Sequence, residues 1–207
     1  MNDLERIALA YVPSRHRDAV DALWALDAAL GRVVATTTEL LIGQMRLTWW
    51  HDRLTGLDAR AVPAEPVLVA LHGIVQNNGI TGAQLALLVE GWEHLLEPLP
   101  LDDDVLIRFA QKRGGQLFGL SAQLAKSSVI AELGPEWALI DFAMHCSDPV
   151  TASRAYQLAR RLFDKTAIHG PKFLRILARL AKAKASQPFE NIADAVSRWD
   201  VLIAVLR

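Results

Sequence analysis

Short breaks containing proline or glycine divide this chain into segments, and every long segment repeats its apolar residues at helical spacing. Three breaks place a proline at the start of the next segment, at Pro135, Pro149 and Pro171, where a helix tolerates the missing N–H donor. No window of four or more residues alternates between apolar and polar side chains as a half-buried strand does. These patterns predict an all-α protein.

The breaks predict about nine to ten helices in a single domain that spans residues 1–207. A chain of this length can bury a sizeable core. Thr38, Thr81 and Asp102 can cap three of the helices, because their side-chain oxygens accept the free N–H groups of a first turn. The expected ranges are about 14–35, 38–55, 65–76, 81–97, 102–126, 134–146, 149–169, 171–185 and 190–206.

The composition indicates a cytoplasmic protein, with peripheral contact to a membrane left open. No apolar run approaches the roughly 20 residues that a membrane-spanning helix needs. The N-terminal stretch MNDLERIALA is too acidic, and its apolar part too short, for a signal peptide. The single cysteine, Cys146, excludes an internal disulfide and a zinc site built from several thiolates.

Charge is distributed unevenly, although the net charge is only −1. Residues 1–150 carry 11 Lys/Arg and 19 Asp/Glu, whereas residues 151–207 carry 11 Lys/Arg and 4 Asp/Glu. Neutralisation of the acidic part by the basic end is one explanation. The other is a surface for an anionic membrane or a partner. Nucleic acid is not expected, because no recognised module accompanies the charge. The candidate surface residues, on one face of helix 171–185, are Lys172, Arg175, Arg179 and Lys182.

The stretch LIGQMRLTWWHDRL, residues 41–54, has apolar residues on two opposite sides of a helix. Because two apolar sides need two packing partners, the pattern predicts a helix in the interior of a multilayer bundle. The adjacent Trp49 and Trp50 point about 100° apart, and both are expected to be largely buried. One side comprises Leu41, Ile42, Met45 and Trp49. The other comprises Leu40, Gly43, Leu47, Trp50 and Leu54.

The same stretch resembles the hydrophobic-Gly-Gln-Ile-Arg-Leu-x-Trp-Trp-x-Asp helix of the squalene/phytoene synthase family. VDALWALDAALGRVVATTTE is similar to the first core helix of that family, and IRFAQKRGGQLFGLSAQLA to its glycine-containing helix in the middle of the chain. The resemblance covers residues 6–126 well. It is sharpest toward a divergent branch that includes a mitochondrial complex I assembly factor, and it implies an isoprenoid-synthase-like helical bundle.

The resemblance also implies a chemistry that can be compared with the sequence. Active members condense two prenyl diphosphates head to head, and two Asp-x-x-x-Asp motifs on facing helices hold the required Mg²⁺. The first motif falls here on residues 31–35, GRVVA, where both carboxylates are absent. The second is expected within 141–160, which contains no such motif. We therefore expect no catalytic residue, no metal site and no cofactor.

These observations predict a catalytically degenerate squalene/phytoene synthase-like protein that binds a prenyl lipid or a partner protein in an assembly or accessory role. One alternative is an active Mg²⁺-dependent head-to-head prenyltransferase, with a prenyl diphosphate as substrate and its ligands elsewhere in the sequence. Convergent carboxylates in a central cavity would favour it. The other alternative is a helical interaction module without a lipid cavity, which a centre filled by side chains would favour.

A central, mainly apolar pocket follows from the resemblance to the pocket-lining helices of the family. Asp27 lies on the apolar face of its helix, where a carboxylate is costly unless paired, and Arg46 or a neighbouring hydroxyl is its expected partner. The glycines of 114–119 either let a neighbouring helix approach closely or leave room for an apolar ligand. The expected pocket residues are Leu23, Asp27, Gly31, Met45, Trp49, Gly114 and Leu117.

Overall fold

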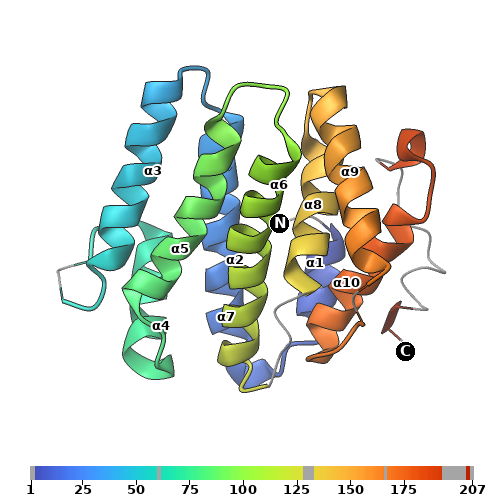
Figure 1. Ribbon diagram of the computed structural model, residues 1–207. Helices are drawn as coiled ribbons and strands as arrows, with labels where there is room; N and C mark the ends of the chain where they lie inside the picture. Colours follow the sequence, from blue (N-terminus) through green and yellow to red (C-terminus); the bar gives the residue numbers. More distant parts are fainter. Residues whose placement is uncertain (1–2, 60–61, 128–132, 166, 193–203, 206–207) are drawn as a thin grey trace.

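The computed structural model describes residues 3–59, 62–127, 133–165, 167–192 and 204–205, which form a bundle of α-helices without a strand (Figure 1). The prediction of an all-α fold is therefore confirmed. The α-helices are α1 (Asp3–Leu9), α2 (Ser14–Ala35), α3 (Leu40–Thr55), α4 (Pro66–Asn78), α5 (Gly82–Glu93), α6 (Asp103–Phe109), α7 (Gln116–Leu124), α8 (Leu133–His145), α9 (Pro149–Phe163) and α10 (Lys172–Ala185). Shorter elements are the 3-10 turns η1 (His94–Leu96) and η3 (Phe189–Asn191) and the π-helical turn η2 (Ala110–Gly115).

Side-chain caps fix several of the helix starts. Thr81 Oγ1 accepts the N–H of Gln84, and the Gln84 side chain accepts the N–H of Thr81 at 2.8 Å, a reciprocal capping box. Asp102 accepts the N–H of Val105 at 2.9 Å at the start of α6. The predicted cap at Thr38 is wrong, because α3 begins after Glu39, whose side chain makes no capping bond.

The predicted helix 102–126 is a rod of three consecutive pieces. α6 continues directly into η2, and η2 continues into α7. This rod and α2 run through the middle of the bundle, between α3 and α5 on one side and α8, α9 and α10 on the other (Figure 1). Residues from both sides therefore meet at η2, which packs against α5 and α8.

α3 lies at an edge of the bundle, where it packs against α5 and α2 (Figure 1). The expectation that it is interior is wrong, because only one of its two apolar sides is covered. The covered side comprises Gly43, Leu47, Trp50 and Leu54. On the opposite side, Leu41 and Met45 are each 71% exposed, Ile42 is 46% exposed and Trp49 is 39% exposed. Trp50 is thus buried as predicted, whereas Trp49 is not.

The C-terminal part agrees with the predicted helices over a shorter length. α9 ends at Phe163 rather than near residue 169. Most of the helix predicted over 190–206 lies outside the described residues. The described residues of this region include η3 and residues 204–205. None of the described helices combines the length and the apolar character that a membrane-spanning segment needs.

Candidate functional site

A charged cluster lies inside the bundle, where α2, α5, η2 and α8 meet. Its members are Asp27 of α2, Arg113 of η2 and Asp141 of α8, and all three are buried. Arg113 donates to both carboxylate oxygens of Asp27, from Nη2 to Oδ2 at 2.8 Å and from Nε to Oδ1 at 3.0 Å. Its Nη1 forms an ion pair with Asp141 Oδ2, also at 2.8 Å. One guanidinium therefore joins two carboxylates from different helices.

Aromatic rings cover the guanidinium of Arg113. Its Cζ lies 4.3 Å from the ring centroid of Trp92 and 4.7 Å from that of Trp137. Rings at these distances attract a cation through their electron-rich faces. Trp92 also donates its indole N–H to Asp27 Oδ1 at 2.8 Å. The same ring thus contacts the cation and holds one of its carboxylate partners.

The carboxylates keep Arg113 charged in this buried position. Burial alone would lower the pKa of Arg113, because it removes water from the charged form. The charges of Asp27 and Asp141, together with their hydrogen bonds, outweigh burial and raise the pKa of Arg113 above its ordinary value.

At the surface, His145 Nδ1 lies 3.6 Å from Asp141 Oδ1. Within the described ranges, no three His, Cys, Asp or Glu side chains gather as a metal site.

Glycines let the backbones approach closely at this cluster. A Cβ on Gly114 would lie 2.1 Å from the carbonyl oxygen of Gly134 on α8. A Cβ on Gly91 of α5 would lie 2.7 Å from the backbone nitrogen of Arg113. Either side chain would overlap backbone atoms, which cannot rotate away. Of the two uses expected for Gly114, the structure shows close helix packing.

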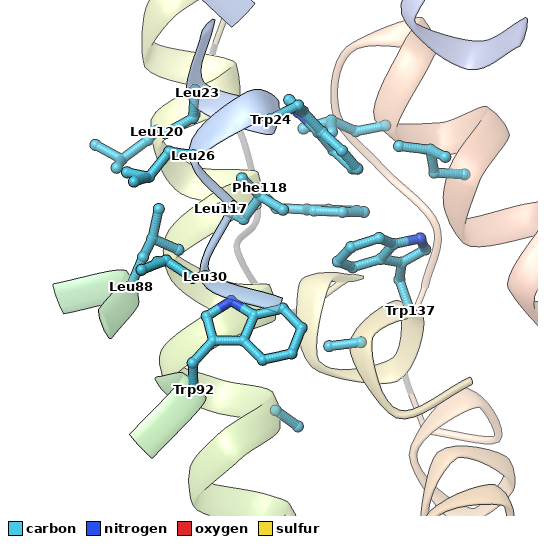
Figure 2. Packing of buried hydrophobic residues seen from close by; sticks show 14 of the residues in the cluster. Leu23, Trp24, Leu26, Leu30, Leu88, Trp92, Leu117, Phe118, Leu120 and Trp137 are labelled. Atoms are coloured by element: carbon cyan, nitrogen blue, oxygen red, sulfur yellow. The ribbon is translucent and has the colours of Figure 1, made fainter. Parts of the chain in front are cut away.

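Side chains also fill the interior next to the cluster (Figure 2). The Trp24 ring lies 5.1 Å from the Trp137 ring, and the Phe118 ring lies 5.4 Å from Trp137. Trp24 donates its indole N–H to Ser121 Oγ at 3.0 Å, so its polar group is satisfied as buried polar groups require. The aromatic rings of α2, α7 and α8 therefore occupy the space between these helices.

The structure brings part of the expected pocket set together in this interior. Four of its members are buried there, namely Leu23, Asp27, Gly114 and Leu117. Gly31 lies beside them against Trp92, since a Cβ at Gly31 would lie 2.9 Å from Trp92 Cη2. Met45 and Trp49 do not face this interior. They are on the exposed side of α3, because that helix turns its Gly43 side toward the bundle.

Two of the three charged residues of the cluster, Arg113 and Asp141, were not predicted from the sequence. The expected partner of Asp27 was Arg46 or a hydroxyl, but Arg46 Nη1 donates to Thr36 Oγ1 at the surface, at 3.2 Å. Arg113 carries the same signal as Asp27, because it lies at helical spacing from Phe109 and Leu117 on an apolar face. A cation and an anion that each interrupt an apolar face are natural partners, since neither is stable there alone.

The four basic residues of α10 are not exposed together, so the expected surface is not a continuous one. Arg175 and Arg179 are half-buried, whereas Lys172 and Lys182 are exposed. Lys172 Nζ lies 4.6 Å from the ring centroid of Tyr11. Arg179 and Lys182 donate to backbone carbonyls outside α10, at 3.3 and 3.2 Å. These contacts help to dock α10 on its neighbours.

A shallow surface cleft of about 510 Å³ lies beside the start of α9. Its arginines are engaged within the chain, since Arg161 donates to Asp103 Oδ2 at 3.1 Å and Arg154 Nε lies 3.6 Å from Asp103 Oδ1. These ion pairs join the basic end of the chain to its acidic first part. The lining residues are Asp103, Pro149, Val150, Ser153, Arg154, Gln157 and Arg161.

Comparisons with known proteins bear on this architecture. The sequence model of the family described as squalene/phytoene synthase matches residues 6–162. The search of curated proteins finds no match. Among solved structures, the crystal structure of a dehydrosqualene synthase in complex with ligand is similar, with a TM-score of 0.65 and 13% sequence identity. That match covers 98% of this chain and 89% of the other. The predicted isoprenoid-synthase-like fold is confirmed.

Proposed function

This chain belongs to the squalene/phytoene synthase family, and from that relation we propose that it is a catalytically degenerate member that acts by binding a partner protein. Active members need Mg²⁺ held between paired carboxylates. The observation that carries the proposal is the guanidinium of Arg113, which lies between Asp27 and Asp141 inside the bundle. A fixed positive charge at this place occupies both carboxylates and repels a divalent cation.

The packing of the interior supports the same proposal. A prenyl chain needs a long apolar cavity between the helices. In this chain Trp92, Phe118 and Trp137 are buried in the interior (Figure 2), and Trp92 leaves no room for a side chain at Gly31. These contacts favour a protein that interacts through its surface over a prenyltransferase or a carrier of prenyl lipids.

The biological role that we propose is an assembly or accessory one. It rests on the sequence resemblance to the branch that includes a mitochondrial complex I assembly factor. A chain that keeps the helices of the family and lacks its carboxylate pairs retains a rigid scaffold without the ionisation chemistry. Such a scaffold can act by presenting an outer surface to another protein.

Diphosphate release tests the loss of catalysis. The full chain is mixed with geranylgeranyl or farnesyl diphosphate and Mg²⁺, and pyrophosphate is measured beside an active dehydrosqualene synthase as the positive control. We expect release equal to that of a sample without protein. Release that increases with the concentration of this protein and stops with EDTA would overturn the proposal.

A binding measurement separates an interaction protein from a lipid carrier. Geranylgeranyl diphosphate is titrated into the protein by calorimetry, with and without Mg²⁺. We expect no saturable heat, because side chains occupy the interior. Saturable binding by the wild-type protein would show that it binds a prenyl ligand. It would contradict the proposal that side chains fill the centre of the functional protein.

A further inference from the structure

An apolar surface runs along the outer side of α3. We call it the α3 stripe, and it consists of Leu41, Ile42, Met45 and Trp49. These residues recur at spacings of three and four, which places them on one side of a helix. The ring of Trp49 packs edge-on against the buried Trp50, with 5.3 Å between centroids. Because α3 lies at an edge of the bundle, no described helix covers the stripe (Figure 1).

Two arginines lie along one flank of the α3 stripe. Arg46 and Arg53 are exposed and lie seven residues apart, on the same side of α3. Arg46 donates to the hydroxyls of Thr36 and Thr37, and the Cζ of Arg53 lies 5.7 Å from the Trp49 ring centroid. Neither arginine forms an ion pair with any carboxylate of the described residues. The edge of the stripe therefore carries two guanidinium charges that no described ion pair neutralises.

We propose that the α3 stripe is the docking site for an amphipathic helix of the partner protein, with carboxylates of that helix facing Arg46 and Arg53. This inference rests on the proposed function, since it assigns the surface through which the partner binds. Written as a heptad, Ile42 and Trp49 occupy a positions, Met45 and Asp52 occupy d positions, and both arginines occupy e positions. Residues at e positions of paired helices select opposite charges on the flank of the neighbour.

The shape of the stripe fits a helix better than a membrane. It is one helix wide and about 12 Å long, at about 1.5 Å per residue, and the polar Gln44 and Thr48 border its other flank. A membrane-binding helix presents a broad apolar face below a basic one. Asp52 lies one turn beyond Trp49 on the stripe side, and residues 1–150 are net acidic. Both features oppose an anionic bilayer.

A second copy of this chain fits less well for a different reason. The stripe is nearly symmetric about Met45, with Leu41 and Trp49 four residues to either side, so two copies would pair antiparallel with Met45 at the two-fold axis. In that arrangement Arg46 of one copy would lie beside Arg46 of the other. Like charges on neighbouring helices are destabilising, whereas an acidic helix removes the conflict.

Two synthetic peptides test the charge and the surface together. Each has about three heptads with leucine at a and d, and carries glutamate at every e and g position or lysine at every e and g position. Like charges keep each peptide monomeric. Fluorescence anisotropy with the full chain at low salt should show at least about tenfold tighter binding of the glutamate peptide. The preference should shrink at high salt, because screening shortens the reach of charge. Equal binding of both peptides, or binding of neither, would overturn the proposal.

Variants test whether the glutamate peptide binds at the α3 stripe. Met45→Glu should abolish binding of the glutamate peptide, and the double variant R46E/R53E should reverse the preference toward the lysine peptide. The matched control is Val150→Glu, which puts the same charge on an exposed apolar residue of α9 and should leave binding unchanged. All four positions are exposed, so the urea midpoints should match the wild type. A double variant that still prefers the glutamate peptide would overturn the proposal.

Separate measurements test the two other possible occupants of the α3 stripe, which are a membrane and a second copy of this chain. Co-sedimentation with phosphatidylcholine/phosphatidylserine vesicles that Met45→Glu abolishes would overturn the proposal in favour of a membrane. A dimer in sedimentation velocity that Met45→Glu abolishes would overturn it in favour of a second copy. Absence of peptide binding without diphosphate release would refute the docking site alone, whereas diphosphate release would refute the proposed function.

Discussion

Arg113, Asp27 and Asp141 hold three charges in the interior, and each charge is stable there only because of the others. Moving a charged group out of water costs several kcal/mol, and close partners with good hydrogen-bond geometry offset that cost. Arg113 makes hydrogen bonds to both oxygens of Asp27 and an ion pair of 2.8 Å with Asp141, and the ring of Trp92 covers its guanidinium. The cluster is therefore sensitive to the loss of any one member.

Arg113→Met should lower the free energy of unfolding by about 3–5 kcal/mol, because it leaves two carboxylates buried without their cation. Urea unfolding followed by circular dichroism measures the change. Neutralising the carboxylates in the triple variant R113M/D27N/D141N should restore part of the loss. A urea midpoint for Arg113→Met equal to that of the wild type would refute the structural role of the cluster.

The effect of Arg113→Met should depend on pH, although Arg113 itself stays charged through the neutral range. The pKa of Arg113 rises on folding, so its contribution is fully present below the unfolded pKa, which lies far above neutral pH. It would be lost only as the pH rises through the still higher folded pKa. The carboxylates that Arg113→Met leaves buried without a cation favour protonation, so the difference in the free energy of unfolding between the wild type and this variant should be smaller at pH 6 than at pH 9.

At the scale of helices, local signals predicted most starts and ends, whereas contacts between distant segments were not predictable. Ser14–Ala35 agrees with the expected range, and Thr81 and Asp102 cap their helices as expected. Periodicity reports which side of a helix is apolar but not whether a neighbour covers it, so the edge position of α3 was missed. The Asp27–Arg113 pair joins positions 86 residues apart, which no single helix reveals.

The π-helical turn η2 is another feature that depends on distant contacts. The sequence of 102–126 has the pattern of an uninterrupted helix, and the turn forms where Gly114 meets Gly134 of α8. π-helices occur mostly as single turns within α-helices, frequently at functional sites. At this turn two backbones touch, and Arg113, which lies within it, contacts both carboxylates.

Gly114→Ala should destabilise the protein by about 1–3 kcal/mol or more, because overpacking of a tight contact displaces the backbone. The overlap is with the carbonyl oxygen of Gly134 at 2.1 Å. Gly119→Ala is the matched control, since a Cβ there would have no neighbour within 4 Å. This control should gain about 0.5–1 kcal/mol, as alanine favours a helix over glycine. Urea midpoints that move in the same direction would contradict the assigned contact.

For the whole molecule, the family fold was predictable and the state of its centre was not. Retained helices such as the one around Trp50 carry the pattern of the family, because burial fixes hydrophobic spacing. Whether a cavity remains depends on how single large side chains are oriented, and Trp92 turns its ring onto Gly31. The uneven charge, too, is partly resolved by contacts such as Arg161 with Asp103.

The contact between Trp92 and Gly31 also determines how the protein should respond to hydrostatic pressure. Pressure favours the state of smaller volume, and the volume lost on unfolding scales with the voids that unfolding eliminates. An interior occupied by Trp92 has little void to lose, whereas Trp92→Ala opens one. High-pressure tryptophan fluorescence should therefore give Trp92→Ala a more negative volume change of unfolding than the wild type. Val69→Ala, at an exposed position of α4, should keep the wild-type value. Equal volume changes for all three proteins would contradict this expectation. They would mean that removing the ring of Trp92 creates no void in the folded protein.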